Sequence, residues 1–595
     1  MSESTSSRLS SRMARLNPFK TRARQDDDED DAGEEIDAAT FAGGGLGAST
    51  GTTHHPLSVS AALQSFLFHK GVLGNSDSDD VKGPLLKALL DKPVVTPPAY
   101  LLDRSHPLPE YFISSSHNTY LMSHQLFGAS SAAAYETTLK AGARCIEIDA
   151  WDNPDNCTEP KVTHGYTLVS NIPFRVVCET IRDVVDHEET AARGRGYAPA
   201  PILVSLENHC DRDGQLRLVE IMKEVWGDRL LSVPIRQKGH EEQEGGDPVR
   251  LEDLGSKIAV IVEYHLPDEV DDSSTSSSSS SDSEEEKQAR EEYKTKKNAT
   301  PPPIIIPELA ELGVYAQSVK PRDDSWYIEG KVKDGPPEHH LINVSESGLA
   351  SHTKEHAPEI ARHNARHLMR VYPKGTRISS RNLSPVPFWA VGAQICALNW
   401  QTFGASMQIN DALFAGTAGY VLKPSALRRD GSGALSSEGR RKTIQLHVAG
   451  ATNVPLPAGD DVGDLKPYLT CSLLQPGTGA ELVKVKRKTG VYHKRNALTR
   501  PFLGSVGGTG ESPAATDPVW DETLEWEFED NELVFVRMLI KSDASFSSNP
   551  ILAVAAVRLL YLDREAGWTF VRMLDLRGHE TGCSLLVKFE IRDVQ

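Results

Sequence analysis

Short apolar runs alternate with longer amphipathic segments through the middle of the chain. The strand-like runs include "ARCIEIDAWD", "APILVSLENHC" and "GSKIAVIVEYHLP", and between them lie "AAAYETTLKAG" and "IPFRVVCETIRDVVDHEE". The last of these has helical periodicity. Strands that alternate with helices predict a parallel sheet with crossover connections, so this region is expected to be α/β. The alternation resumes near residue 303 and continues to "GTAGYVLKP".

The chain between these two stretches, and the chain after them, have different patterns. Residues 271–286 hold nine serines and six acidic residues but no lysine or arginine. Such a segment buries too little apolar surface to offset its ordering entropy, so we expect a disordered linker. From residue 443 onward, runs such as "TIQLHVAGATNVPL", "KPYLTCSLL" and "DPVWDETLEWEFED" predict short strands separated by turns. This pattern is typical of a β-sandwich.

The N-terminal hundred residues are mostly polar. Residues 1–55 are Ser-rich, then acidic, then Gly-rich, and are expected to be disordered. Residues 56–100 contain two short amphipathic pieces, "LSVSAALQSFLF" and "VKGPLLKALL". The connector "NSDSDD" lacks the central glycine and terminal glutamate of a calcium-binding loop. We therefore expect a small helical adaptor there.

Composition narrows the class of protein. The net charge of −19 argues against a general nucleic-acid binder. Seven cysteines without a CxxC pair indicate neither a disulfide framework nor a zinc site, so a reducing cytosol is expected. No stretch approaches 18 apolar residues, and the N-terminus lacks a signal-peptide core. Residues 8–24 are basic and amphipathic, so they could bind an anionic membrane or act as a transit peptide. A disordered basic tail is the favoured interpretation.

Four polar clusters fall where strand-like runs end. Glu147 and Asp149 are two positions apart, so both carboxylates project from the same face of one strand. Carboxylates buried side by side are costly unless a cation lies between them. In parallel barrels, the carboxyl ends of the strands face the active site. The four clusters are His117-Asn118, Glu147 with Asp149, His164, and Glu207-Asn208-His209.

The residue types in these clusters predict a metal site with proton-transfer groups beside it. The ligands offer only oxygen atoms, which suits a hard cation such as Ca²⁺ better than zinc. His117 and His164 are then available for proton transfer or for stabilising phosphoryl charge. Each cluster alone is commonly a solvated strand edge, but their shared placement indicates a site. The predicted ligands are Asn118, Glu147, Asp149 and Glu207.

These strings resemble a known family. "ISSSHNTYL", "GARCIEIDAWD", "THGYTL" and "ILVSLENHC", followed by an acidic linker, resemble the X half of eukaryotic phosphoinositide-specific phospholipase C. "RHNARHLMRVYPKGTRISSRNLSP", "QICALNWQT" and "GYVLKP" resemble its Y half, and the tail resembles its C2 domain. The similarity covers roughly residues 105–595 and is delta-like without an N-terminal PH domain. It implies cleavage of an inositol phospholipid to diacylglycerol and an inositol phosphate.

The resemblance also implies an α/β fold class with a distorted TIM barrel split into X and Y halves. An all-β C2-type sandwich would follow, and a short helical adaptor would precede. The expected parts are a disordered tail (1–55), an adaptor with an EF-hand-like remnant (56–104), the X half (105–265), a disordered acidic linker (266–302), the Y half (303–428) and the C2 domain (440–595).

Roles for individual residues follow from the resemblance. His117 would stabilise the pentavalent phosphoryl group, and His164 would protonate the departing diacylglycerol oxygen. Glu147 would be the base for the inositol 2-hydroxyl, whose attack gives a cyclic phosphate that water opens. The Ca²⁺ ligands would be Asn118, Glu147, Asp149 and Glu207.

The headgroup positions depart from the family. Arg370 and Tyr372 match residues that grip a ring phosphate and stack on inositol, whereas Asn343 stands where a serine is usual. Ile261 and Glu263 occupy the positions of a family lysine–x–lysine. Each lost charge-assisted contact is worth about 1.5–3 kcal/mol. We therefore expect a weakened preference for the 4,5-bisphosphate relative to phosphatidylinositol or its monophosphate.

The expected contacts with the membrane are also atypical. Lys466 precedes "PY", and only Asp543 remains in the later loop, so a structural C2 domain is expected instead of calcium-dependent docking. Apolar contact with the membrane would be made by loops at the barrel mouth. The acidic linker at 266–300 would cover that mouth and inhibit the enzyme until an anionic membrane repels it. Leu126, Tyr166 and Leu168 match the family's apolar ridge, whereas Thr376 replaces a common aromatic residue.

Three functions stay open from the residues. The first is a calcium-dependent phospholipase C acting in signal transduction, cytoplasmic and peripheral at membranes, with inositol lipid as its partner. The second is a catalytically weak lipid-binding or scaffolding protein, for which the complete catalytic set would be unnecessary. The third, a glycerophosphodiester-type barrel, leaves the Y-half strings and C2 tail unexplained. We expect a monomer that does not bind nucleic acid.

Overall fold

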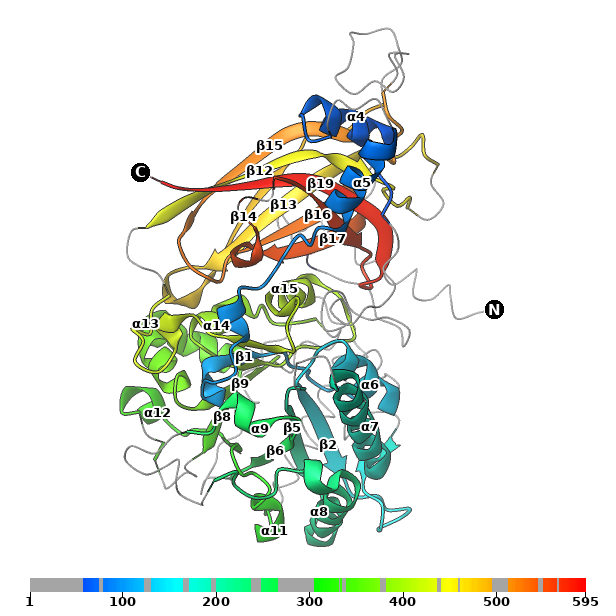
Figure 1. Cartoon of the computed structure of the whole chain (residues 1–595). Coiled ribbons are helices and arrows are strands. Elements are labelled where there is room, and N and C mark those ends of the chain that lie inside the picture. The colour runs from blue at the N-terminus through cyan, green and yellow to red at the C-terminus, as the bar shows by residue number, and fades with distance from the viewer. Residues whose placement is uncertain are drawn as a thin grey trace, which may run out of the picture.

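The computed structural model contains a closed barrel of mostly parallel strands and an antiparallel sandwich (Figure 1). Within the described part of the chain, no helix combines the length and apolar character needed to cross a membrane. The described residues are 31, 57–73, 79–121, 130–163, 171–193, 199–236, 248–265, 304–330, 332–333, 339–374, 381–435, 440–457, 461–494, 512–543, 549–563, 565 and 567–594.

Eleven strands form the barrel sheet, in the order β11-β1-β10-β9-β8-β7-β6-β5-β2-β3-β4. Three of them, β3, β4 and β11, pair antiparallel to their neighbours, and the remaining eight run parallel. A parallel bridge from Ser115, just after β1, to Cys145 closes the ring. The bounds are β1 (Tyr111–Ile113), β2 (Cys145–Trp151), β3 (Lys161–Val162), β4 (Ile172–Pro173), β5 (Ile202–His209), β6 (Ile258–Glu263), β7 (Gln317–Val319), β8 (His340–Ser345), β9 (Leu368–Tyr372), β10 (Ile395–Cys396) and β11 (Tyr420–Leu422).

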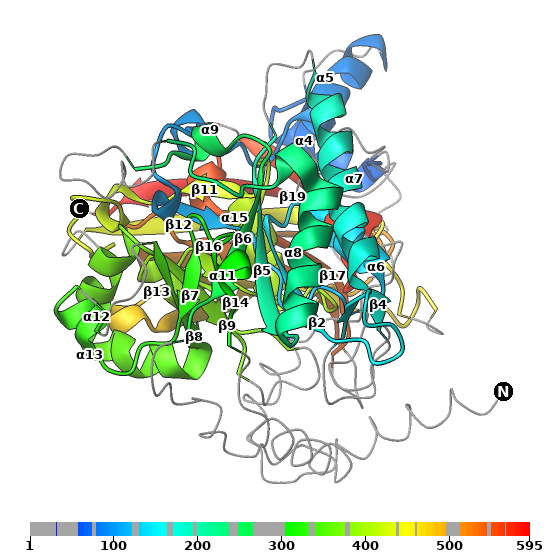
Figure 2. The ribbon, with the colours of Figure 1, turned by 90° about the horizontal axis from the view of Figure 1, so that it is seen from below.

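Helices cover the barrel from outside, and α6, α7 and α8 lie side by side along β2 and β5 (Figure 2). In α7, the buried residues Val177, Ile181 and Val184 recur at helical spacing, so one face packs against the sheet. The side chain of Asp211 caps α8 by accepting from the Gly214 N–H. The bounds are α6 (Ala132–Lys140), α7 (Phe174–Ala192), α8 (Arg212–Trp226), α9 (Leu251–Leu254), α11 (Pro307–Ala310), α12 (Ser325–Ile328), α13 (Glu346–Asn364), α14 (Val386–Ala390) and α15 (Ala405–Phe414).

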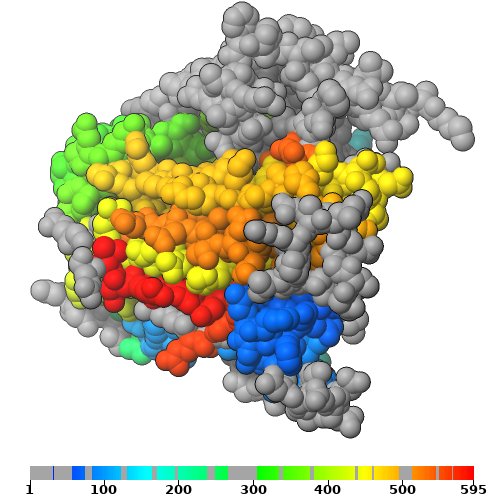
Figure 3. All heavy atoms as spheres, turned by 90° about the horizontal axis from the view of Figure 1, so that it is seen from above, coloured from blue at the N-terminus to red at the C-terminus, as the bar shows by residue number. Residues whose placement is uncertain are grey.

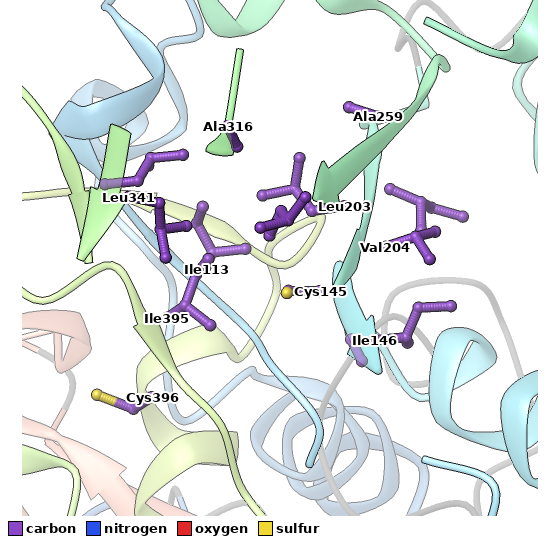
Figure 4. Packing of buried hydrophobic residues seen from close by; sticks show 14 of the residues in the cluster. Ile113, Cys145, Ile146, Leu203, Val204, Ala259, Ala316, Leu341, Ile395 and Cys396 are labelled. Carbon is purple, nitrogen blue, oxygen red and sulfur yellow. The ribbon is translucent and has the colours of Figure 1, made fainter. Parts of the chain in front are cut away.

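Apolar side chains from several strands fill the barrel interior. Ile113, Leu203 and Leu341 come from β1, β5 and β8 and converge at its centre (Figure 4). All three are buried. The centre of the barrel is therefore a packed apolar core.

The predicted acidic linker connects two neighbouring strands. Its residues, 266–302, lie outside the described part of the chain. β6 and β7 on either side pair in parallel, with Val262 opposite Gln317. The two α/β halves of the sequence thus complete one barrel, as expected for this fold class.

The C-terminal part is all-β, as its alternating pattern predicts. Eight strands form one antiparallel system in the order β14-β13-β16-β17-β18-β19-β12-β15. β12 pairs with both β15 and β19 along most of its length. The bounds are β12 (Arg441–Thr452), β13 (Pro467–Pro476), β14 (Leu482–Lys488), β15 (Val519–Glu529), β16 (Phe535–Ser542), β17 (Ile551–Arg558), β18 (Trp568–Leu574) and β19 (Glu580–Asp593).

The sandwich packs on the barrel through aromatic side chains. The rings of Trp389 in α14 and Phe535 in β16 lie 6.1 Å apart. The Tyr561 hydroxyl donates to the carbonyl of Leu413 in α15 at 2.6 Å. These contacts are buried, so the two parts form one continuous structure.

The N-terminal adaptor is helical and lies on the sandwich. It contains α4 (Ala61–His69) and α5 (Asp79–Asp91), as the amphipathic pieces predict. The ring of Phe66 meets Trp568 of β18 edge-on, at 5.0 Å. In the space-filling view, these blue residues lie against the orange and red C-terminal strands (Figure 3). The two helices therefore pack against the sandwich.

Candidate active site

Strand register brings three carboxylates together at the carboxyl end of the barrel. β2 and β5 are parallel neighbours, and Asp149 lies directly opposite Glu207. Glu147, two residues earlier on β2, points to the same face. The nearest carboxylate oxygens of the three residues all lie within 4.8 Å of one another. Such convergence of negative charge is unfavourable without a positive counterpart.

Asp149 shows most directly that these residues fit a cation. Its Oδ2 accepts from the Tyr120 hydroxyl at 2.5 Å, but its buried Oδ1 has no hydrogen-bond partner in the described part of the chain. Burial, followed by the charges of Glu207 and Glu147, raises the pKa of Asp149 well above its ordinary value. An oxygen that is buried and unsatisfied is costly, and a hard cation would satisfy it.

Glu147 is held from two sides. Its Oε1 accepts from the Arg370 guanidinium at 2.5 Å, and both side chains are buried. Its Oε2 accepts from the backbone N–H of Asn118 at 2.7 Å. A buried ion pair of this kind is costly to break, because removing one partner leaves the other uncompensated. The carboxylate is therefore fixed in position.

The turn that carries Asn118 has an unusual backbone conformation. Its φ is +46°, in the left-handed region that asparagine tolerates better than most residues. The Tyr120 hydroxyl lies 3.2 Å from Asn118 Oδ1 and also contacts Asp149. Asn118 is buried. The Tyr120 hydroxyl thus links the Asn118 amide oxygen to Asp149, and the role of Asn118 as a metal ligand stays a prediction.

His117 faces the same site and has a defined tautomer. Its Nδ1 lies 2.8 Å from Oδ1 of Asn399, whose Nδ2 donates to the Arg381 carbonyl at 3.4 Å. This orientation makes Nδ1 the protonated nitrogen and leaves Nε2 toward Glu147, 4.0 Å from Oε2. Burial lowers the pKa of His117, against an opposing effect of Glu147. The imidazole is therefore favoured in its neutral form.

Glu207 and Glu263 form the more exposed side of the site. The Glu207 side chain is 40% exposed, and its Oε1 lies 3.2 Å from His209 Nε2. Glu263, at the end of β6, accepts from the Asn208 backbone N–H at 3.3 Å. Burial, and then the charge of Glu207, raises the pKa of Glu263. Ile261 is buried in the barrel core.

The predicted headgroup residues lie together on the neighbouring strands β8 and β9. Arg370 Nη1 donates to Asn343 Oδ1 at 3.2 Å, and the guanidinium lies 5.6 Å from the Tyr372 ring centroid. Arg370 also pairs with Glu147, so it links the carboxylates to the headgroup side. The Nε atom of Arg370 is buried without a hydrogen-bond partner in the described part of the chain.

Several predicted residues lie outside the described part of the chain. These are His164, the apolar-ridge positions Leu126, Tyr166 and Leu168, Thr376 and the linker. In the sandwich, Lys466 and Asp543 are adjacent, because the Asp543 N–H donates to the Lys466 carbonyl at 2.9 Å. It stays a prediction that the loops carrying Lys466 and Asp543 do not support Ca²⁺-dependent membrane docking.

Two supporting residues were not found from the sequence. Asn399 fixes the His117 tautomer, and Tyr120 contacts both Asn118 and Asp149. Asn399 is the asparagine of the string "QICALNW" and comes directly after its apolar run, so its place at a strand end was a usable signal. Tyr120, two residues after Asn118, carries no comparable signal in the sequence.

Comparisons with known proteins agree with this geometry. Residues 104–264 match the model of the phosphatidylinositol-specific phospholipase C X domain, and residues 309–426 match that of the Y domain. The mouse protein 1-phosphatidylinositol 4,5-bisphosphate phosphodiesterase delta-3 is 32% identical over 484 residues, which are 80% of this chain and 55% of that one. The Candida albicans protein 1-phosphatidylinositol 4,5-bisphosphate phosphodiesterase 1 is 30% identical, with 82% and 47% covered. The chain spans about half the length of these curated relatives.

A solved structure supports the fold independently. The crystal structure of L. pealei PLC21 superposes with a TM-score of 0.66 at 22% identity. The superposition covers 100% of this chain and 69% of that one. At this identity the likeness supports the architecture, a barrel followed by a sandwich, and the chemistry rests on the side chains above.

Proposed function

The chain belongs to the phosphatidylinositol-specific phospholipase C family, and on that premise we propose that it is a Ca²⁺-dependent phosphodiesterase of inositol phospholipids. Its products would be diacylglycerol and an inositol phosphate, formed through a cyclic phosphate. The substrate is a membrane lipid, so the protein would work at the membrane surface. Localisation in the cytoplasm with peripheral membrane contact fits this activity.

One observation carries the proposal: three carboxylates and Asn118 converge beside His117, and the buried Asp149 Oδ1 has no partner in the described structure. This donor set consists of oxygen atoms, as Ca²⁺ requires. When bound there, Ca²⁺ would lower the pKa of a coordinated hydroxyl and neutralise phosphate charge. The residues that would hold it are Asn118, Glu147, Asp149 and Glu207.

The side chains divide the reaction between them. Glu147 takes the proton of the inositol 2-hydroxyl while that oxygen attacks phosphorus, and the bond from phosphorus to the diacylglycerol oxygen breaks. His117 would stabilise the developing phosphoryl charge by donating from Nε2, which requires that nitrogen to be protonated when substrate binds, because in the neutral tautomer it carries only a lone pair. Asn399 holds that imidazole in orientation. His164 supplies the proton that the departing diacylglycerol oxygen needs.

The second half of the reaction uses the same groups in reverse. The cyclic phosphate accepts water at phosphorus, His164 takes the proton of that water, and the 2-oxygen leaves with the proton held by Glu147. Arg370 keeps Glu147 in place during both halves through their buried ion pair. Attack within one substrate molecule also removes much of the entropic barrier.

Glu263 and Ile261 determine the headgroup preference in this proposal. The family lysines would attract ring phosphates, whereas Glu263 adds negative charge beside Glu207. A bisphosphate would therefore gain less here than in a site with two lysines. We propose that phosphatidylinositol and its monophosphate are used comparatively well.

The test measures water-soluble inositol phosphate released from vesicles of phosphatidylinositol, its monophosphate or its bisphosphate. Each lipid is offered with excess Ca²⁺ or with chelator, to wild type, His117→Ala and His164→Ala. We expect Ca²⁺-dependent release that both substitutions reduce by at least about 100-fold. His187→Ala, an exposed histidine on α7, is the matched control. Vesicle binding without release from any lipid would instead identify a lipid-binding scaffold.

A further inference from the structure

A second cluster of metal-ligating side chains lies at the opposite end of the barrel from the carboxylates. His340 is the first residue of β8, and His367 immediately precedes β9. His363 is in the last turn of α13. Asn343 and Arg370 lie further along the same two strands, toward the carboxyl end. The histidines therefore belong to the amino end of the barrel, away from the site described above.

The three imidazoles are in mutual contact. His340 and His363 are 3.2 Å apart between their Nε2 atoms. The rings of His340 and His367 stack at 4.0 Å between centroids, and those of His363 and His367 at 4.9 Å. One nitrogen from each of the three lies within 4.8 Å of the others. His340 and His363 are buried, and His367 is partly exposed.

These distances approach those of a zinc site. Two imidazole nitrogens bound to one tetrahedral zinc ion lie about 3.3–3.4 Å apart, since each Zn–N bond is about 2.0–2.1 Å. The pair His340–His363 already has this separation. The three ligand nitrogens lie within 4.8 Å of one another. The His367 nitrogen would therefore need to move by about 1–1.5 Å to bind the same ion. His363 and His367 are also four residues apart on one helical turn, where two side chains share a face.

Hydrogen bonding assigns the tautomer that ligation requires. Asn364 Nδ2 donates to the Val391 carbonyl at 2.8 Å, which turns its Oδ1 toward His363 Nδ1 at 3.1 Å. Nδ1 is then the protonated nitrogen, and the lone pair of His363 lies on Nε2, inside the cluster. Ligating histidines commonly donate their second ring N–H in this way.

Neighbouring side chains enclose the cluster. The edge of Trp326 covers His363 at 4.9 Å between ring centroids. Lys423 lies close by, and its Nζ donates to the Asn364 carbonyl. Burial lowers the pKa of Lys423, which reduces its repulsion of a metal ion.

We propose that His340, His363 and His367 form a structural zinc site, with water at the fourth position beside the partly exposed His367. Nitrogen ligands suit Zn²⁺ and exclude Ca²⁺, which prefers oxygen. The ion would tie the end of α13 to β8 and to the start of β9. It takes no part in catalysis, and the inference does not rest on the proposed function.

Zinc titration of the full chain tests this site. Metal-stripped protein is titrated calorimetrically with ZnCl₂ in excess Ca²⁺, so that the carboxylates are already occupied. We expect one bound zinc, and at least about tenfold weaker binding in His367→Asn. His187→Asn, an exposed histidine outside the cluster, should bind zinc like wild type. Asp149→Asn should also retain zinc, because its carboxylate belongs to the other end.

Two further measurements distinguish a loss of zinc binding from misfolding of the variant. Circular dichroism and thermal unfolding in chelator should be alike for wild type and His367→Asn, whose side chain is the least buried of the three. Co²⁺ bound to wild type should give the intense visible absorption of a tetrahedral site, which needs no variant. Absence of zinc binding to wild type in excess Ca²⁺, or an octahedral cobalt spectrum, would overturn the proposal.

Discussion

The two ends of one barrel carry opposite chemistries on the same strands. At the carboxyl end, Asn343 and Arg370 border a group of converging carboxylates, and the nearby oxygen donors suit a hard cation. At the amino end of β8 and β9, His340 and His367 meet in a nitrogen cluster. The loops at the carboxyl end carry reactive groups in barrels of this kind, whereas the amino end supports stability. The difference separates the proposed catalysis from the proposed structural site.

The largest effect should come from Glu147→Gln at the carboxyl end. The substitution removes a proposed metal ligand and base, and it leaves the buried Arg370 guanidinium without its ion-pair partner. We expect a loss of at least about 1,000-fold in inositol phosphate release. Zinc binding, measured calorimetrically in excess Ca²⁺, should persist. Loss of zinc binding together with activity would show that the two ends are not independent.

A smaller effect should follow from Asn399→Ala. This residue contacts His117 Nδ1 but not the carboxylates, so it is a positioning residue. We expect kcat to fall by about 10–100-fold while the Ca²⁺ concentration for half-maximal activity stays unchanged. Asn399→Asp, which keeps an acceptor oxygen, should recover part of the rate and shift the pH profile. A changed calcium requirement would contradict the assignment.

Headgroup selectivity should respond to Glu263→Lys. A lysine at the end of β6 restores one charge-assisted contact with a ring phosphate, worth about 1.5–3 kcal/mol. The ratio of bisphosphate to phosphatidylinositol turnover should rise by at least about tenfold in vesicle assays. Glu263→Gln, which only removes the negative charge, should give a smaller rise. An unchanged ratio in both variants would exclude Glu263 from the headgroup preference.

The smallest expected difference between the two ends is in the number of protons released when each end binds its metal ion. The raised pKa of Asp149 means that the folded, metal-free carboxyl group still holds a proton over a range of pH where a free aspartate has lost it. Ca²⁺ binding in that range must displace the proton, so affinity rises by about tenfold per pH unit as pH rises. The pKa values of His363 and His367 are lowered to about 3 and about 2, so these two ligands should release almost no protons when zinc binds near pH 6. Calorimetry in buffers of different ionisation enthalpy measures both.

The fold was largely predictable, because apolar periodicity is a local property. The runs around Ile146 and Val204 predicted β2 and β5, and the alternating tail predicted the sandwich. β14 was missed, since "LVKVKRK" alternates with lysines and arginines, as was β17, whose "ILAVAAVR" is short and rich in alanine. Side chains two positions apart on a strand share a face, so the same local pattern predicted that the carboxylates of Glu147 and Asp149 lie together.

The rest of the site depends on contacts between distant residues. His117 and Asn399 are 282 positions apart, so no local pattern joins them. The left-handed turn at Asn118 is likewise a product of its surroundings. The histidine cluster was overlooked because zinc was judged from cysteines alone, although "HNARH" holds two histidines at helical spacing. His340, 23 positions earlier, enters only through the packing of α13 on β8.

The most direct test of the central claim follows inositol phosphate release from phosphatidylinositol vesicles during a Ca²⁺ titration of chelator-stripped protein, with and without prior loading with one zinc. We predict no release before Ca²⁺ is added, full activity once Ca²⁺ saturates, and the same calcium dependence whether or not zinc is bound. Release that persists in chelator, or none at any Ca²⁺ concentration from a folded, vesicle-bound protein, would contradict a calcium-dependent site at the carboxyl end of the barrel.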